Sequence, residues 1–146
     1  MKIFIGTDHA GYEMKEELKK YLGDLGYELE DKGAYSFDAE DDYPDFIFPV
    51  AKSVTEEKGN FGIIIGGSGQ GEGMCANRVK GARACEYYGG NTDIIKISRE
   101  HNNANVLSLG ARFISAEEAK QVVKIFLETN FSGEERHMRR IKKIDL

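Results

Sequence analysis

The segment from Gly66 to Gly73 (GGSGQGEG) has the composition of an anion-binding loop. It contains five glycines in eight residues, which leaves its backbone N–H groups free to turn toward a negative charge. A tight turn would account for one or two of these glycines. The segment lacks the Lys-Ser/Thr ending of a nucleotide-binding P-loop, and its Gly71-x-Gly73-x-x-Ala76 match to the dinucleotide motif begins several residues past the preceding apolar run. The loop therefore favours a phosphate or a developing oxyanion as its ligand.

Glu72 is the one acidic residue inside this loop, and two roles are open to it. It is either a solvated residue in the first turn of a helix, where the dipole favours a carboxylate, or a general base. Asp8 and His9 follow the first apolar run of the chain and are further candidates for substrate contact. The three histidines of the chain lie in three separate segments, so the sequence predicts no metal site.

A basic cluster near the C-terminus could bind a doubly charged phosphate. Arg136 and Arg140 are four residues apart and would share one face of a helix, which suits a bidentate phosphate contact. Arg112 could add a third guanidinium. The alternative is a basic end that offsets an acidic body.

The elements that must position these residues alternate along the chain. Short apolar runs alternate with runs of helical period, and this order predicts a parallel sheet covered by helices. Strands are expected at 2–7, 27–31, 61–65, 83–87 and 105–109. A capping-box pair, Ser115 with Glu118, precedes one of the helices. The sequence predicts one α/β/α domain over residues 1–146, ending in a basic helix at about 134–144, and it does not predict the order of the strands.

Composition excludes several classes of function. The 146 residues carry a net charge of −5, with 40% hydrophobic and 31% charged residues, which argues against broad nucleic-acid binding. No apolar run approaches the roughly 20 residues of a membrane span, and no signal peptide is recognised at the start. Cys75 and Cys85 have no metal or redox spacing, so we expect a cytoplasmic protein with reduced thiols. The acidic stretch 34–44 is interpreted as a solvated loop.

Six segments together resemble the ribose-5-phosphate isomerase B family, which also includes galactose-6-phosphate isomerase subunits. They span nearly the whole chain: IGTDHAG (5–11), DYPDF (42–46), IIIGGSGQGEG (63–73), ANRVKGARA (76–84), SREHNNANVLSLGAR (98–112) and RHMRR (136–140). The resemblance implies a Rossmann-like α/β/α sandwich around the five-stranded parallel sheet. It also implies a homodimer, possibly paired into a dimer of dimers, with sites shared between subunits and no cofactor.

The resemblance implies a role for each matching residue. Asp8 and His9 would contact the sugar phosphate, and Tyr43 would line the sugar pocket. His101 would assist opening of the furanose ring, and Asn102 would hold a sugar oxygen. The anion hole for the enediolate would be formed by the backbone of Gly67, Ser68, Gly69, Gln70 and Gly71, together with the Ser68 side chain, and the phosphate would be held by Arg112, Arg136 and Arg140.

One position departs from the family pattern. Many members have a cysteine base directly after the third strand, where this chain has Gly66. A branch of the family instead uses a glutamate from a GGSGxGE loop, which makes Glu72 the expected base. Cys75 lies nine residues later, and we expect it to be a small buried residue.

The expected activity is therefore the interconversion of ribose 5-phosphate and ribulose 5-phosphate through an enediolate. Two alternatives stay open: an isomerase of a tetrose or hexose phosphate, and a sugar-phosphate-binding homologue without activity. His101 and Asn102 precede the fifth strand, whereas Asp8 and the glycine loop follow strands. These groups should lie at opposite edges of one sheet, so a second subunit is expected to complete the site, with the subunit that supplies each arginine left open.

Overall fold

A computed structural model describes residues 1–145. It has a single five-stranded sheet in which every neighbouring pair is parallel, in the order β2-β1-β3-β5-β4. The strands are β1 (Ile3–Thr7), β2 (Leu29–Asp31), β3 (Phe61–Gly66), β4 (Ala84–Tyr87) and β5 (Val106–Gly110). The predicted α/β class is confirmed, and the strands lie within one or two residues of their expected ends.

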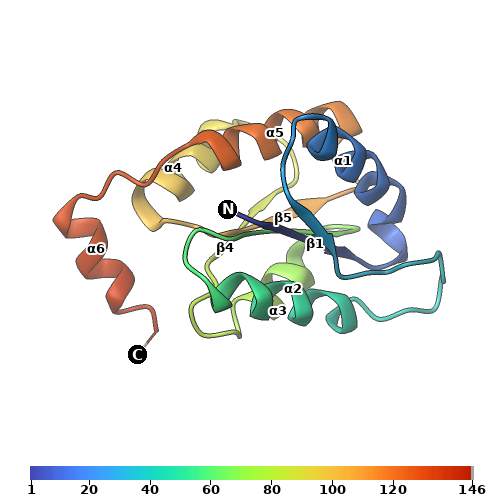
Figure 1. The fold of residues 1–146 in the computed structure, drawn as a ribbon, viewed down its shortest axis with the longest axis horizontal. Coiled ribbons are helices and arrows are strands. Elements are labelled where there is room, and N and C mark those ends of the chain that lie inside the picture. The colour runs from blue at the N-terminus through green and yellow to red at the C-terminus, as the bar shows by residue number, and fades with distance from the viewer. Residues whose placement is uncertain (146) are drawn as a thin grey trace.

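Helices cover both faces of the sheet and form three layers (Figure 1). One face is covered by α1 (Tyr12–Asp24), α4 (Asp93–Asn102) and α5 (Ala116–Glu128), and the other by α2 (Pro44–Glu56) and α3 (Gln70–Ala76). A short 3-10 turn, η1 (His9–Gly11), joins β1 to α1. None of the helices in residues 1–145 is long and apolar enough to cross a bilayer.

The central strand β3 shows why this sequence forms a two-sided sheet. All six of its residues are buried, as the continuous apolar run predicts for a strand covered on both faces. Ile63 and Ile65 pack into the core beneath α1, α4 and α5, whereas Ile64 packs into the core beneath α2 and α3. The expected helix cap is present, because Ser115 Oγ accepts a hydrogen bond of 3.1 Å from the N–H of Glu118.

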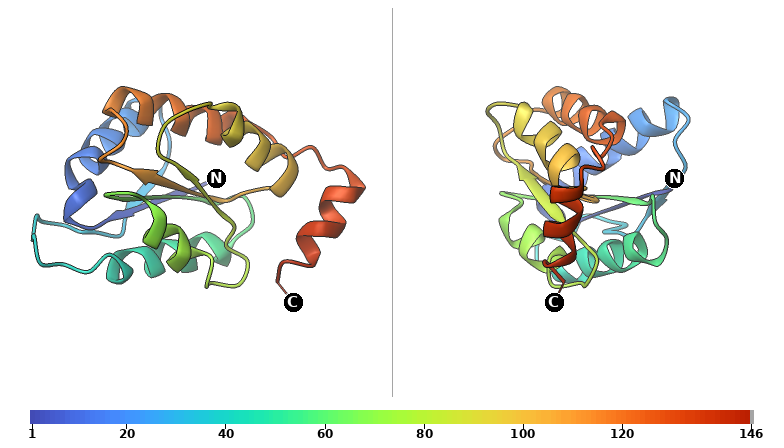
Figure 2. Two further views of the ribbon diagram at one scale, coloured as in Figure 1. Left: turned by 180° about the vertical axis from the view of Figure 1, so that it is seen from behind. Right: turned by 90° about the vertical axis from the view of Figure 1, so that its left-hand side faces the viewer.

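The C-terminal helix α6 (Glu135–Lys142) stands away from the sandwich, at the end where α4 finishes (Figures 1 and 2). Its one buried residue is His137, whose ring stacks on His101 of α4 with 4.3 Å between centroids and 14° between planes. Its other residues are exposed or half-buried, and most of them are charged. The predicted basic helix is therefore present, and α4 is the helix against which it packs.

Candidate active site

A cavity of about 530 Å³ opens where β1 and β3 end. Ligand sites of open parallel sheets lie at this edge. The lining comes from the segments that follow β1, β3 and β5, together with Tyr43 at the start of α2. It includes eight residues that the sequence singled out: Asp8, His9, Tyr43, Gly67, Ser68, Gly71, Glu72 and Arg112.

Residues in and after β5 donate hydrogen bonds to carbonyl groups of the glycine loop, whereas several N–H groups of the loop donate to no acceptor in residues 1–145. The carbonyl of Gly67 accepts from the N–H of Arg112 at 3.0 Å, and the carbonyl of Gly69 accepts from Ser108 Oγ at 2.6 Å. Gly69 has φ of 79°, which a residue with a Cβ adopts only with strain. Within residues 1–145, the N–H groups of Gly67, Ser68 and Gly69 donate to no acceptor. A loop of this kind can bind an anion or an oxyanion.

Glu72 is buried at the end of β3, with 4% of its surface exposed, so the solvated role in the first turn of α3 is wrong. Gly66 leaves the room for its carboxylate: a Cβ at residue 66 would overlap both carboxylate oxygens and the carbon between them. Burial raises the pKa of the Glu72 carboxyl, and the nearby charges of Asp8 and Glu86 add to the rise. The carboxyl therefore has the environment of a general base.

Asp8 and His9 lie side by side at the end of β1. The Asp8 carboxylate caps η1 by accepting from the N–H of Ala10 at 3.0 Å. Nδ1 of His9 donates to Oδ1 of Asp41 at 2.7 Å, and the His9 N–H donates to the same oxygen at 3.0 Å. This contact with Asp41 raises the pKa of His9. Asp8, His9 and Asp41 offer metal-ligand atoms within 4.8 Å of one another, but the bond to Asp41 takes the Nδ1 of His9 that faces them.

Two long side chains lie against the loop where a glycine leaves space for them. The hydroxyl of Tyr43 lies where a Cβ of Gly71 would stand. The guanidinium of Arg112 lies across Gly67, with Nη1 3.0 Å from the position of a Cβ there. These glycines thus let an aromatic ring and a cation approach the loop backbone closely.

The remaining predicted residues lie elsewhere. Gly69 and Gln70 belong to the loop but do not line the cavity. The other four are His101, Asn102, Arg136 and Arg140, and they lie in or beside the C-terminal end of α4 and in α6. That end leads into the start of β5, so these four are at the opposite edge of the sheet from the cavity (Figure 2). One copy of the chain does not bring the two groups together.

Three residues of the site region are absent from the sequence-based set. Asp41 belongs to the acidic stretch interpreted as a solvated loop, yet its side chain is 9% exposed and pairs with His9. His137 stacks on His101, and Glu86 reaches from β4 toward α3, where its carboxylate overlaps the place of a Cβ on Gly73. No local pattern marks these residues, because each contact joins segments far apart in the sequence. Cys75 is half-buried rather than buried, and burial raises the pKa of its thiol.

Fold and site together define a doubly wound α/β protein with a glycine-rich cleft at the carboxyl edge of its sheet. Residues 3–144 match the model of the family described as Ribose/Galactose Isomerase. Ribose-5-phosphate isomerase B of Mycobacterium tuberculosis is 41% identical over 141 residues, which cover 97% of this chain and 86% of that protein. A putative sugar phosphate isomerase of Bacillus subtilis is 40% identical, over 99% of this chain and 95% of that protein.

Solved structures agree with these relatives. Ribose-5-phosphate isomerase B from Mycoplasma genitalium, crystallised with bound ribulose 5-phosphate, is 42% identical and superposes with a TM-score of 0.92 over 98% of this chain and 93% of that one. The enzyme from Thermotoga maritima is 45% identical, with a TM-score of 0.91 over 99% and 97% of the two chains. The chain belongs to the ribose/galactose isomerase family, as the sequence motifs predicted, and it is an aldose–ketose isomerase.

Proposed function

We propose that this protein interconverts ribose 5-phosphate and ribulose 5-phosphate through an enediolate, with Glu72 as the base. The observation that carries the proposal is the Glu72 carboxylate, buried in the space that Gly66 leaves at the end of β3. The choice of substrate is supported by the 42% identical relative whose structure contains ribulose 5-phosphate.

The reaction moves a proton between C2 and C1 of the open-chain sugar and needs a base near the carbon acid. Glu72 takes the proton from C2 and returns it to C1, while the loop N–H groups and Ser68 stabilise the negative charge that develops on oxygen. A positioned base contributes about 10²–10⁴-fold in rate and works best when its pKa approaches neutrality. Burial raises the pKa of Glu72 in that direction. One oxyanion donor contributes a further ~10²–10³-fold. The reaction is redox-neutral and calls for no redox cofactor.

Substrate binding uses both edges of the sheet and therefore two subunits. Asp8, His9 and Tyr43 contact the sugar phosphate, and Arg112 holds the phosphate from the loop side. His101 assists ring opening and Asn102 holds a sugar oxygen, both contributed by the second subunit of a homodimer.

The arginines of α6 accompany His101. The stacking of His137 on His101 joins α6 to the end of α4, so Arg136 and Arg140 move with His101 as one unit. Arg136 is exposed and its Nε donates to Glu134 at 2.9 Å, a surface pair that is easily exchanged for a phosphate. We therefore assign the α6 arginines to the subunit that also supplies His101.

The Glu72→Gln variant tests whether Glu72 is the base. Glu13→Gln is the matched control, because Glu13 is an exposed acid in the first turn of α1. Ketose formation from ribose 5-phosphate should fall by at least ~10²-fold in kcat for Glu72→Gln with little change in KM, and stay at the wild-type level for Glu13→Gln. Wild-type turnover in Glu72→Gln would remove Glu72 as the base. Across four-, five- and six-carbon sugar phosphates, kcat/KM should be highest for the five-carbon substrate.

The shared site is tested by mixing subunits. Glu72→Gln and His101→Ala chains are each inactive alone, but a mixed dimer with shared sites has one intact site. After full exchange at equal amounts, about a quarter of the wild-type activity should return, because half the dimers are mixed and each has one of two sites. No recovery after verified exchange would contradict the shared site.

A further inference from the structure

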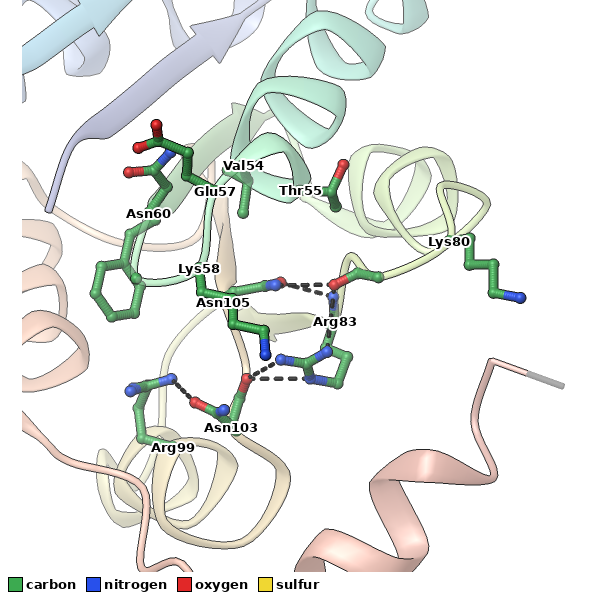
Figure 3. Close-up of a pocket in the computed structure, with 13 residues that line it drawn as sticks. Val54, Thr55, Glu57, Lys58, Asn60, Lys80, Arg83, Arg99, Asn103 and Asn105 are labelled. Carbon is green, nitrogen blue, oxygen red and sulfur yellow. Dashed lines mark hydrogen bonds between the residues drawn. The ribbon is translucent and has the colours of Figure 1, made fainter.

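A second cavity, of about 540 Å³, lies apart from the catalytic cleft, and Figure 3 shows the residues that line it. Its walls come from the turn between α2 and β3, from the segment that leads into β4, and from the end of α4 with the residues that lead into β5. It therefore lies at the amino edge of the sheet. The proposed isomerase reaction uses none of its lining residues.

The charged side chains that line this cavity are mostly cationic, whereas the chain as a whole is acidic. Four cationic side chains line it, against the single carboxylate of Glu57, although the whole chain carries a net charge of −5. The cations are Lys58, Lys80, Arg83 and Arg99. In Figure 3 the Lys58 ammonium points toward the Arg83 guanidinium, whereas Lys80 extends away from the cavity. Two cations facing each other across an open space repel unless an anion lies between them.

Arg99 is a buried cation without an acidic partner. It is 6% exposed and lies over the rings of Phe61 and Phe126, at 4.8 and 5.7 Å from their centroids. Its Nε donates to the carbonyl of Thr129 at 3.0 Å and its Nη1 to Oδ1 of Asn103 at 3.0 Å. Within residues 1–145, its Nη2 makes no hydrogen bond and no carboxylate lies within 4.0 Å of the guanidinium.

Arg83 is half-buried and also binds Asn103 rather than a carboxylate. Its Nη2 donates to the Asn103 carbonyl at 2.9 Å, and its Nη1 to the Gly81 carbonyl at 3.2 Å. Asp145 acts on Arg83 only from beyond ion-pair distance, since its carboxylate accepts from the N–H of Gly81 at 3.2 Å. Burial lowers the pKa of both Arg83 and Arg99, and the more distant charge of Asp145 offsets only part of this effect at Arg83.

We propose that this cavity is a second anion site, which binds a small phosphate-bearing molecule between Lys58, Arg83 and Arg99. A guanidinium has five N–H donors, and both arginines keep donors that no group of the described chain accepts. Asn60 and Asn103 also line the cavity, and their side-chain oxygens accept from the N–H of Lys2 and from Arg99. The volume exceeds that of inorganic phosphate and leaves room for an organic group or a second phosphate.

A purely structural role for the arginines accounts for only part of this arrangement. Arg83 and Arg99 bind carbonyls at the end of α4, where cations are favoured by the helix dipole. That role does not explain why the ammonium of Lys58, on an exposed turn, points toward the Arg83 guanidinium although neither forms an ion pair within residues 1–145. Lys58 is therefore the residue that separates the two interpretations, and its replacement leaves the α4 contacts in place.

The experiment is a titration of ¹⁵N-labelled protein with pyrophosphate at constant ionic strength, followed by amide chemical shifts. Amides of Gly59, Asn60 and Gly81 report on this cavity, whereas those of the glycine loop report on the catalytic cleft. We expect saturable shifts at the first group, with affinity reduced about five- to tenfold by Lys58→Gln. Lys20→Gln, an equal charge change on α1 where Lys20 already pairs with Asp24, should bind as the wild type does.

The catalytic cleft also attracts phosphates, so a second arm uses Arg112→Ala. This variant should lose shifts in the glycine loop and keep those at Gly59 and Gly81. Shifts confined to the glycine loop, shifts that grow linearly without saturation, or equal affinity in Lys58→Gln and the wild type would each overturn the proposal.

Discussion

Replacing Gly66 by alanine tests the position of the Glu72 carboxylate without altering the carboxylate itself. A Cβ at residue 66 would overlap both carboxylate oxygens. Gly66 does not have a positive φ, so β3 tolerates alanine, and the overlapped atoms are the far end of a flexible side chain. We therefore expect a folded protein whose Glu72 carboxylate has left the end of β3.

The size of the effect follows from what the displaced group does. Loss of a positioned base lowers kcat by about 10²–10⁴-fold, which is ~2.7–5.4 kcal/mol of the activation barrier. KM should change less than about threefold, because the contacts of Tyr43 and Arg112 with the loop do not involve residue 66. Overpacking typically costs ~1–3 kcal/mol of the free energy of unfolding, so the unfolding transition of the variant is measured alongside its activity.

The assay is ketose formation from ribose 5-phosphate, with thermal unfolding followed by circular dichroism. Gly23→Ala in α1 is the matched control, since a Cβ there meets nothing within 4 Å. It should keep wild-type kcat and gain up to ~1 kcal/mol of stability from helix propensity. A Gly66→Ala protein with wild-type kcat would refute the assignment of Glu72 to that space.

Three further substitutions probe the same site. Glu86→Gln removes a charge that raises the pKa of Glu72, so the acid limb of the pH profile of kcat/KM should move to lower pH. An acid limb at the wild-type pH would show that Glu86 does not influence the base. Asp41→Asn weakens the contact that raises the pKa of His9, so imidazole NMR titration should give a lower pKa than in the wild type. Gly66→Cys combined with Glu72→Ala places a thiol near the position of the lost carboxylate. Part of the activity should return, and iodoacetamide should abolish it by alkylating that thiol. An inactive double variant would contradict the idea that a base on residue 66 can replace the Glu72 carboxylate.

The fold was largely predictable from the sequence because its elements have strong local patterns. The apolar run at Phe61–Gly66 and the capping box at Ser115 mark a buried strand and a helix start, and both are observed. The strand order was not predictable, since β1 pairs with β3 and β4 with β5 through contacts that no local pattern specifies. The position of α6 likewise depends on contacts between distant segments, such as that of His137 with His101.

The site was predictable where residue type alone limits the chemistry. A loop with five glycines has few other roles, and its place at the end of β3 followed from the strand. Burial of Glu72 and pairing of Asp41 with His9 were not predictable, because burial depends on what other segments place above a residue. The acidic composition around Asp41 indicated solvent exposure, which holds for neighbours such as Asp38 but not for Asp41 itself.

The central claim, that Glu72 removes the proton from carbon, is tested most directly by isotope exchange. Wild-type and Glu72→Gln proteins are incubated with ribose 5-phosphate in D₂O, and deuterium at C2 of the recovered aldose is followed by NMR. The account predicts exchange at least ~10²-fold slower in Glu72→Gln, with substrate binding retained in a direct titration. Exchange at the wild-type rate in Glu72→Gln would contradict it, because another group would then be removing the proton.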